Sequence, residues 1–426
     1  MKRAPKRYEA PSAIYQEVVQ ALALNYNGYE VHKIIDTFIR DTIFRGSVNR
    51  RSDVWKRLFK VYDFSVLPVN DTKLFSTLCE FSSRKEYEEL WDYALEGIED
   101  KKTYKLTEVP QKWILNKKNI RIGKQLVKKL QHVFKPHRAQ LAAAITATLN
   151  NIDATEKQIA VTPEKYLSFC SVMWLENLLT QYFNKRNIPT YDLQHGATRV
   201  YRKNPVDEIE YSNIVSDYHF TWGDYSRDEL IGFGIEPARL ISGGYPHRHT
   251  INPIRKPVGK KVIVFLSRFD FEQENYEVLA ILAALNKAYN GAFSFSFKLH
   301  PSLNAKKYGE VMETQYPDAN FTLLNSRITL HELFTKEQAD LCIAVNTSCY
   351  FECYMLGMPT FRYFSETFDL EHPVREDLFD STEKLQLLLD RLYNEFGRYY
   401  LQEDIYRELD YALGLSKNEY PAVLNA

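Results

Sequence analysis

The sequence has no excess charge of either sign, few cysteines and no long apolar run. Lys+Arg and Asp+Glu both total 55 in 426 residues, so the formal net charge is zero. That balance gives no general reason to expect nucleic-acid binding. No run approaches the roughly 18 uninterrupted apolar residues of a membrane span. Polar residues after the basic start at Met1 interrupt any signal-peptide core. We expect a cytoplasmic protein, with peripheral contact at the inner face of the membrane left open.

The five cysteines do not have the spacing of a disulfide framework or a zinc site. Their number is odd, no CxxC pair exists, and no histidine lies beside the two that are one helical turn apart. We predict that they are small buried side chains and that the chain holds no metal. They are Cys79, Cys170, Cys342, Cys349 and Cys353.

The order of apolar segments predicts two α/β halves. From Tyr166 onward, short strand-like runs alternate with helical stripes, which favours parallel sheets flanked by helices. Residues 247–260 contain prolines and a glycine and form the best linker candidate. We expect an N-terminal domain over 1–250, helical to about 150 and α/β from about 160. A C-terminal domain over 251–380 and a helical region near the junction over 381–426 would complete the chain.

Polar residues follow three predicted strands of the second half. Parallel strands bring their carboxyl ends to one edge of a sheet, where phosphates and nucleotides bind. Ser348 would also cap the helix that follows it, Lys298 would add charge, and His300 would donate a hydrogen bond to a phosphate. Glu352 lies one helical turn after Ser348 and is a candidate for ribose hydroxyls. The predicted nucleotide-binding residues are Ser267, Arg268, Lys298, His300, Pro301, Asn346, Thr347, Ser348 and Glu352.

Four motifs in this order resemble bacterial GT-B glycosyltransferases of surface polysaccharides. They are Gln194-His195-Gly196 after a strand, Gly244-Tyr245-Pro246, Lys298-Leu299-His300-Pro301, and Ser348-x3-Glu352-x4-Gly357-x-Pro359. The resemblance covers about residues 160 to 365. The motifs are most similar to those of two groups of enzymes. One group is the capsule-type transferases that use CMP-activated sialic acid or Kdo, and the other is the CDP-glycerol glycerophosphotransferases.

The resemblance implies two Rossmann-like domains that face a cleft, with the donor nucleotide in the second. It implies that His300, Thr347 and Ser348 contact the donor phosphate. The main hypothesis is an inverting transfer from a nucleotide sugar, such as a CMP-sugar, to a glycan or lipid-linked glycan of a capsule or lipopolysaccharide. No DxD motif stands in the cleft-facing positions, and GT-B enzymes generally use helix dipoles and basic groups, so we expect no cofactor or metal.

Three other functions stay open at this point. A transferase could move a polyol phosphate from CDP-glycerol. An enzyme like the nucleotide-sugar 2-epimerases would need no acceptor and would release free sugar and nucleotide. A binding subunit of the same shape would bind nucleotide without turnover.

The first half is expected to supply the catalytic base for the acceptor hydroxyl. His195 is the leading candidate because it follows a strand directly and a neutral histidine can accept a proton near pH 7. A hydrogen bond that only holds the turn is the structural alternative for His195. Asp207 and Glu208, with Glu210, form an acidic segment of rival bases, and Asp192 would point into the domain instead.

Residues Lys117 to Arg138 form a basic stretch with apolar residues on one approximate face. Such a stretch can lie on an anionic membrane surface, although a solvated helix face is the plainer interpretation. The apolar residues are Ile122, Leu126, Leu130 and Val133.

Overall fold

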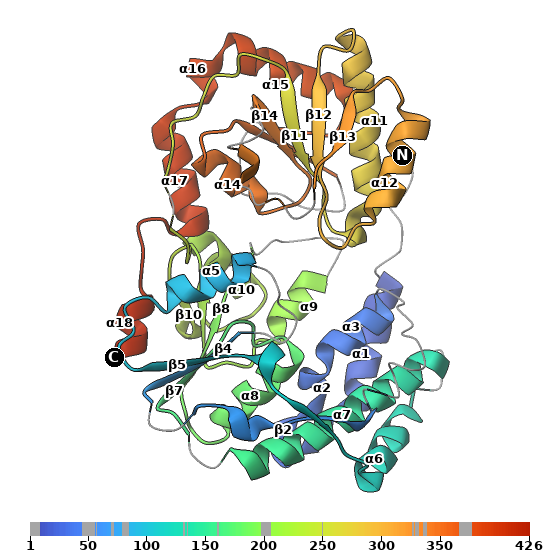
Figure 1. The fold of residues 1–426 in the computed structure, drawn as a ribbon, viewed down its shortest axis with the longest axis vertical. Helices are drawn as coiled ribbons and strands as arrows, with labels where there is room; N and C mark the ends of the chain where they lie inside the picture. Colours follow the sequence, from blue (N-terminus) through green and yellow to red (C-terminus); the bar gives the residue numbers. More distant parts are fainter. Residues whose placement is uncertain are drawn as a thin grey trace. The chain divides into compact units, whose positions relative to one another are not determined.

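In the computed structural model, the chain divides into two compact units, each built on a parallel sheet (Figure 1). The structure describes residues 9–44, 56, 58–69, 72–78, 85–130, 133, 135–159, 162–196, 206–248, 250–325, 328, 332–334, 339–365 and 377–426. The first unit comprises residues 1–198, 204–247 and 416–426, and the second comprises residues 199–203 and 248–415. The division falls between His247 and Arg248, and the last eleven residues group with the first unit.

The first unit has a six-stranded sheet in the order β10-β9-β8-β7-β4-β5. All neighbouring strands in it are parallel. The strands are β4 (Leu74–Leu78), β5 (Lys101–Lys105), β7 (Lys165–Ser168), β8 (Thr190–Leu193), β9 (Tyr218–Thr221) and β10 (Leu240–Ser242). Two antiparallel pairs lie outside it, β1 (Asn25–Tyr26) with β2 (Tyr29–Glu30) and β3 (Lys60–Tyr62) with β6 (Gln111–Trp113).

The rest of the first unit is largely helical. They are α1 (Glu9–Leu22), α2 (Val31–Ile34), α3 (Asp36–Ile43), α5 (Lys85–Ala94), α6 (Lys117–Val127), α7 (Lys135–Gln158), α8 (Trp174–Asn184), α9 (Val206–Ser212), α10 (Asp224–Gly232) and α18 (Tyr420–Asn425). Short 3-10 turns span Phe64–Val66, Leu106–Glu108 and Pro237–Arg239.

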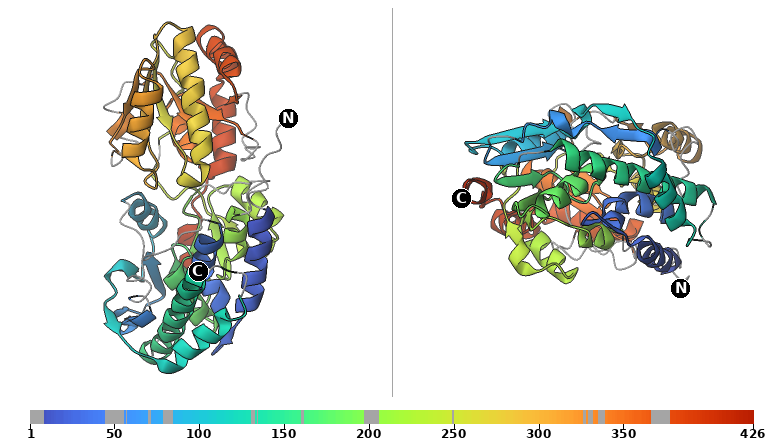
Figure 2. Two further views of the ribbon diagram at one scale, coloured as in Figure 1. Left: turned by 90° about the vertical axis from the view of Figure 1, so that its right-hand side faces the viewer. Right: turned by 90° about the horizontal axis from the view of Figure 1, so that it is seen from below.

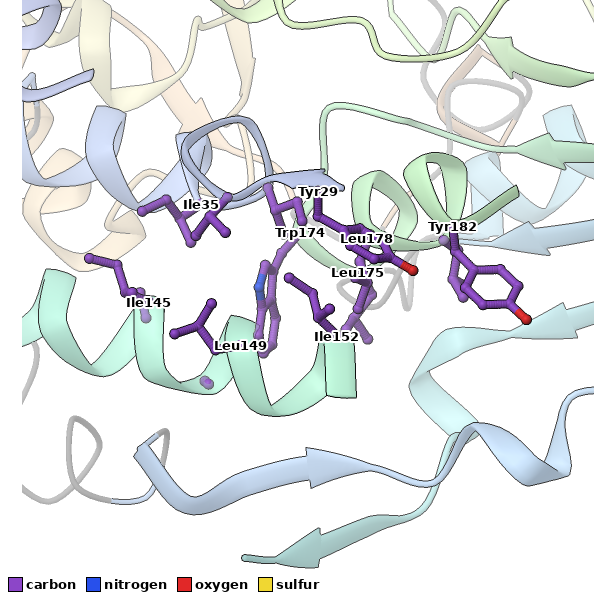
Figure 3. Close-up of a cluster of buried hydrophobic side chains, with 14 of the residues drawn as sticks. Tyr29, Ile35, Ile145, Leu149, Ile152, Trp174, Leu175, Leu178 and Tyr182 are labelled. Carbon is purple, nitrogen blue, oxygen red and sulfur yellow. The ribbon is translucent and has the colours of Figure 1, made fainter. Parts of the chain in front are cut away.

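Apolar side chains from α2, α7 and α8 form the core beneath these helices (Figure 3). Leu149 of α7 and Trp174 of α8 are buried there. The Trp174 indole N–H donates to Thr148 Oγ1 at 2.8 Å, so the ring satisfies its polar atom inside the core. This packing explains why α7, which has apolar residues around much of its surface, is stable as a 24-residue helix.

The second unit has a sheet of the same size in the order β13-β12-β11-β14-β15-β16, again with parallel neighbours. Its strands are β11 (Lys261–Phe265), β12 (Ser294–Lys298), β13 (Phe321–Leu323), β14 (Leu341–Ala344), β15 (Thr360–Tyr363) and β16 (Leu378–Phe379). Its helices are α11 (Glu272–Ala288), α12 (Ala305–Gln315), α14 (Cys349–Met355), α15 (Thr382–Asn394), α16 (Phe396–Tyr399) and α17 (Gln402–Leu413), with a 3-10 turn at Phe269–Phe271.

Both faces of the second sheet are covered. Val262 and Val264 of β11 pack under α11 and α15, which lie side by side (Figure 2). Ile263 and Phe265 point to the opposite face and join Cys353 of α14. This alternation on a strand buried on both faces accounts for the continuous apolar run in the sequence.

The α/β prediction with two Rossmann-like domains is confirmed by these sheets. Two strands of the first sheet, β4 and β5, lie before residue 150, where mostly helical structure was expected. Strand β5 has the sequence KKTYK and lies at the sheet edge, so it lacks an apolar run. Whether the two sheets face a common cleft stays a prediction.

The basic stretch from 117 to 138 is not one helix. Helix α6 ends at Val127 and α7 begins at Lys135. Leu130 and Val133 are buried in the core of the first unit, and Ile122 and Leu126 pack against it. The prediction of an apolar face that could meet a membrane is therefore wrong for these four residues. None of the helices in the described part of the chain is long and apolar enough to cross a bilayer.

Candidate functional site

The carboxyl ends of three adjacent strands of the second sheet bring together the residues predicted to bind a donor. Phe265 at the end of β11 is in register with Lys298 on one side and with Ala344 on the other. Two residues further on, Ser267, His300 and Asn346 therefore occupy equivalent positions past β11, β12 and β14. The Ser267 hydroxyl donates to the Asn346 carbonyl oxygen at 3.2 Å, which joins two of these ends directly.

Ser267 is held in place by Asn275 of α11. The Ser267 N–H donates to Asn275 Oδ1 at 2.9 Å, and Asn275 Nδ2 donates back to the Ser267 carbonyl at 2.9 Å. Both residues are buried. Next to them, Arg268 is partly exposed and its Nε lies 3.1 Å from Asp270 Oδ2. The buried bonds fix the backbone of the β11 turn.

His300 is oriented by Ser302, a residue that the sequence did not single out. The Ser302 N–H lies 3.1 Å from His300 Nδ1, and the Ser302 hydroxyl lies 2.8 Å from the same nitrogen. A backbone N–H can only donate, so Nδ1 accepts and the neutral ring carries its hydrogen on Nε2. The Phe269 N–H donates to Ser302 Oγ at 3.2 Å, which ties the β11 turn to the β12 turn. A hydroxyl two residues after a histidine is the signal that could have found Ser302.

Lys298 and Glu352 both act electrostatically on the thiol of Cys349. Lys298 Nζ donates to the Ile328 carbonyl at 2.7 Å. Burial raises the pKa of the Cys349 thiol; the Glu352 carboxylate raises it further, and the Lys298 charge opposes them. Lys298 and Glu352 thus have opposite effects on the pKa of one group, the Cys349 thiol at the start of α14. Pro301 is exposed.

The turn from β14 into α14 differs from the prediction at Ser348. Ser348 occupies the N-cap position but has helical angles, φ −64 and ψ −18, and its side chain makes no capping hydrogen bond. Capping by a side chain needs an extended N-cap backbone, so the prediction that Ser348 caps α14 is wrong. Thr347 Oγ1 instead accepts from the Cys349 N–H at 3.4 Å. Asn346 has a φ of +46, which asparagine tolerates better than most residues.

At the carboxyl edge of the first sheet, His195 follows β8 and is partly exposed. Its ring lies 5.9 Å from the Tyr87 ring and 6.0 Å from the Phe169 ring, centroid to centroid. Aromatic contacts from α5 and from the end of β7 therefore hold the histidine.

The turn that carries His195 is held by the buried Gln194. Gln194 Nε2 donates to the Gly196 carbonyl at 2.7 Å and to Ser226 Oγ at 2.9 Å. Gln194 Oε1 accepts from the Trp222 N–H at 2.7 Å. These bonds brace the turn, a role that the sequence analysis had weighed for His195.

Asp192 points into the first unit, as expected, and is 2% exposed. It accepts from the Ser171 N–H and the Ser171 hydroxyl, both at 2.8 Å. Asp192 Oδ2 also lies 3.1 Å from Nδ1 of His219, a buried residue on β9 that the sequence analysis missed. Asp192 and His219 are partners in the register of β8 and β9. This contact therefore depends on how the strands pair and is not visible in the sequence.

The rival bases lie on α9. Glu208 is exposed, and the side chain of Asp207 lies outside the described residues. Glu210 accepts from Arg40 Nη1 at 2.6 Å, and Arg40 Nε donates to the buried Asp36 at 2.7 Å. Glu210 is therefore part of an ion-pair network with α3.

A second histidine near the carboxyl edge of the first sheet was also missed. His247 Nε2 lies 3.6 Å from Glu89 Oε2 of α5, and both side chains are partly exposed. The Tyr245 ring stacks on His247 at 5.8 Å. His247 directly follows the Gly-Tyr-Pro motif, which is the signal that could have found it. Helix α5 thus contacts both histidines, through Tyr87 and through Glu89.

Comparisons with known proteins support the fold. No family model matches the sequence, and no curated protein is similar to it in sequence. Among solved structures, an α,α-trehalose-phosphate synthase (UDP-forming) from Burkholderia vietnamiensis has a TM-score of 0.50 at 11% identity. The match covers 83% of this chain and 97% of the synthase chain.

Two further solved structures have lower scores. A UDP-GlcNAc 2-epimerase from Neisseria meningitidis bound to UDP-GlcNAc has a TM-score of 0.47 at 13% identity and covers 82% of this chain and 97% of its own. The lipopolysaccharide outer core galactosyltransferase WaaB has a TM-score of 0.47 at 10% identity, and the match covers 83% of this chain and 96% of WaaB. The two six-stranded parallel sheets, together with the likeness to the trehalose-phosphate synthase, show a fold of the GT-B type with two Rossmann-like units. At such low identity the likeness concerns the fold alone.

Proposed function

We propose that the chain is a glycosyltransferase that uses a nucleotide sugar. In this proposal the carboxyl edge of the second sheet binds the phosphate of the donor, and His195 of the first unit accepts the proton of the acceptor hydroxyl. The observation that supports it most strongly is the equivalence of Ser267, His300 and Asn346 at three adjacent strand ends. Ligands in open α/β sheets bind outside such ends.

The chemistry of this edge suits a leaving phosphate. The phosphate gains negative charge as the glycosyl bond breaks, and preorganised donors stabilise that charge best. The tautomer imposed by Ser302 leaves the ring hydrogen of His300 on Nε2, so this nitrogen is the donor in the proposal. Thr347 and Ser348 would add hydroxyl donors, and Glu352 would accept from the ribose.

The proposal extends to an inverting transfer without a metal, to a glycan or lipid-linked glycan of the cell envelope. Inversion needs one base on the acceptor and one stabilised leaving group, which are the roles proposed for His195 and His300. A CMP-sugar is the proposed donor, because the motifs around His300 and Ser348 resemble those of cytidine-nucleotide transferases.

A thermal-shift panel of CMP, CDP, UDP, GDP and their sugars tests the donor class. A ligand at 100 times its dissociation constant should stabilise the protein by about 2.7 kcal/mol. We expect a cytidine nucleotide to give the largest shift and His300→Ala to reduce it. If no nucleotide shifts the melting temperature, the proposal is wrong.

Turnover with the stabilising donor then separates the reaction classes. A glycosyltransferase releases nucleotide in step with acceptor modification. Release of free sugar and nucleotide without any acceptor would instead identify an enzyme like the 2-epimerases, and transfer from CDP-glycerol alone would identify a polyol-phosphate transferase. Binding with no turnover against any acceptor would leave a binding subunit.

A further inference from the structure

Three consecutive large apolar side chains are exposed between β6 and α6. Trp113 is 66% exposed, Ile114 is 44% exposed and Leu115 is 61% exposed. Single exposed apolar residues are ordinary in soluble proteins, but contiguous exposed ones indicate a surface that binds something. The Trp113 ring lies 6.4 Å from the Phe59 ring, and most of its surface is open to solvent.

Ordered backbone on both sides holds this triplet outward. Strand β6 pairs with β3, and the Ile114 N–H donates to the Phe59 carbonyl at 2.9 Å. On the other side, the Asn116 side chain caps α6 by accepting from the N–H groups of Lys118 at 3.1 Å and Asn119 at 3.2 Å. The exposed apolar side chains are therefore fixed features of the first unit.

The stretch of sequence that contains the triplet has basic residues and no acidic ones. Residues 109–152 contain no Asp or Glu, although the whole chain is neutral. On α6 and its C-cap, four cations recur at the spacing i, i+4, i+7 and i+11, which places them on one face of a helix. All four are exposed: Lys117, Arg121, Lys124 and Lys128.

The opposite face of α6 is fixed against α7 (Figure 1). A Cβ atom on Gly123 would lie 2.6 Å from Thr146 Oγ1 and 2.8 Å from the Ala142 carbonyl oxygen, so only glycine allows this approach. Asn119 and Val127 on the same side of the helix are buried. With that side packed on α7, the basic face points away from the core and lies next to the apolar triplet in sequence.

We propose that Trp113, Ile114 and Leu115, together with the basic face of α6, bind the surface of an anionic lipid bilayer. Tryptophan and aliphatic side chains insert at the boundary between headgroups and acyl chains. Lysine and arginine beside them attract anionic headgroups. Nucleic acid would also attract the cations, but an exposed Ile-Leu pair adds little to binding a phosphate backbone. The bilayer is therefore the partner that uses both parts of the surface.

This inference does not depend on the proposed transferase activity. The test is flotation of the full chain with vesicles of neutral phosphatidylcholine or of phosphatidylcholine with 30% phosphatidylglycerol, which needs no turnover. We expect binding to the anionic vesicles, weaker binding to the neutral ones, and loss of binding as the salt concentration rises. Equal binding to both vesicles, or binding to neither, would overturn the inference.

Two double variants separate the apolar and the charged parts. Arg121→Gln with Lys124→Gln should lower the partition coefficient about 25-fold, because each cation near an anionic surface contributes about fivefold. Trp113→Ala with Leu115→Ala should lower it about tenfold or more, because the inserted apolar area is lost. Unchanged partitioning in either variant would contradict the assignment of that part.

Matched controls lie on the second unit. Leu387 is 51% exposed, like Leu115, and Lys306 is an exposed helical cation. Leu387→Ala and Lys306→Gln should leave partitioning unchanged, with the same melting temperature as the test variants. A duplex oligonucleotide in the same buffer forms the last arm. Tight binding to it without vesicle binding would assign the surface to nucleic acid and overturn the inference.

Discussion

The carboxyl edges of the two sheets are each braced by one buried amide side chain, Gln194 in the first unit and Asn275 in the second. Each of these side chains makes three hydrogen bonds. The edges differ in how they hold a histidine. His195 is held by the rings of Tyr87 and Phe169, whereas His300 is held by hydrogen bonds from Ser302.

The two histidines have different tasks in the proposed reaction. His195 is the proposed base, so its imidazole changes protonation in each cycle. A backbone N–H bonded to Nδ1 selects one form, which suits a donor that keeps its hydrogen. If the comparison is correct, substitutions at His195 should affect proton transfer and substitutions at His300 should affect donor binding.

The largest effect is expected at His195. His195→Ala should lower turnover by about 10³-fold, within the range for a lost general base, while donor affinity stays nearly unchanged. The acidic limb of the pH–rate profile should disappear, because protonation of this histidine is what removes the base. Steady-state kinetics from pH 5 to 9 and donor titration measure both effects.

A purely structural histidine would behave differently at this position. His195→Ala would then lower the melting temperature and leave the acidic limb in the residual activity. Tyr87→Leu is the control, because it removes one ring contact but keeps the imidazole; its acidic limb should remain. Largely intact transfer in His195→Ala would move the base to Asp207, Glu208 or Glu210, each to be tested by amide substitution.

The next largest effect is expected at His300. His300→Ala should lower turnover by about 10²-fold, the scale for a lost electrostatic donor, and should also weaken nucleotide binding. Ser302→Ala is the matched variant, because it removes the hydroxyl but keeps the backbone N–H that selects the tautomer. It should lower turnover only severalfold. Equal losses in the two variants would show that the hydroxyl, and not the tautomer, matters.

Substitution of the two buried amide side chains that hold the sheet edges, Gln194 and Asn275, should change stability instead of turnover. Gln194→Ala and Asn275→Ala should each lower the free energy of unfolding by about 2–3 kcal/mol, because each substitution leaves buried hydrogen-bonding groups without a partner. Gln273→Ala is a control, since its amide is exposed and donates to Glu277 at 3.2 Å. Chemical denaturation measures all three. A loss below 1 kcal/mol in either buried variant would mean that water replaces the missing bonds.

The sequence predicted those parts of the fold that depend on local apolar patterns. Strands β11 and β14 are apolar runs buried on both faces, so both were found. Strand β5 was not found, because an edge strand of lysines carries no such pattern. The end of the chain was also unpredictable. Tyr420 is buried in the first unit and donates to the Gly244 carbonyl at 2.6 Å, a contact between distant parts of the sequence.

The candidate site was predicted in outline and missed in its supporting contacts. Strand ends and histidines are visible in a sequence, so His195 and His300 could be named. Ser302 and His219 act through hydrogen bonds that depend on turn geometry and on register across a sheet. The error at Ser348 has the same origin, because capping depends on a backbone conformation that residue type alone does not set.

The smallest expected effect concerns the helical layer of the first unit, away from its sheet edge. Glu156 of α7 accepts from Tyr29 at 2.6 Å and from Lys185 and Arg186, both at 2.8 Å. It thereby links α7 to β2 and to the end of α8. If the helical layer is independent of the carboxyl edge of the first sheet, a change at Glu156 should alter the stability of the protein. It should leave the turnover and the pH–rate profile that depend on His195 unchanged.

Glu156→Gln tests this through the pH dependence of stability. Partial burial raises the pKa of Glu156, but hydrogen bonds from Arg186, Lys185 and Tyr29 outweigh it and lower the pKa to about 2. A carboxylate with a lowered pKa stabilises the fold at pH values above its unfolded pKa of about 4.5 and loses that contribution as the pH falls toward 2. The melting temperature of the unmodified protein should therefore exceed that of Glu156→Gln by a few degrees at pH 7. The two should converge between about pH 4.5 and pH 2. A difference that stays constant over this range would mean that the charge of Glu156 contributes nothing and that only its shape is needed.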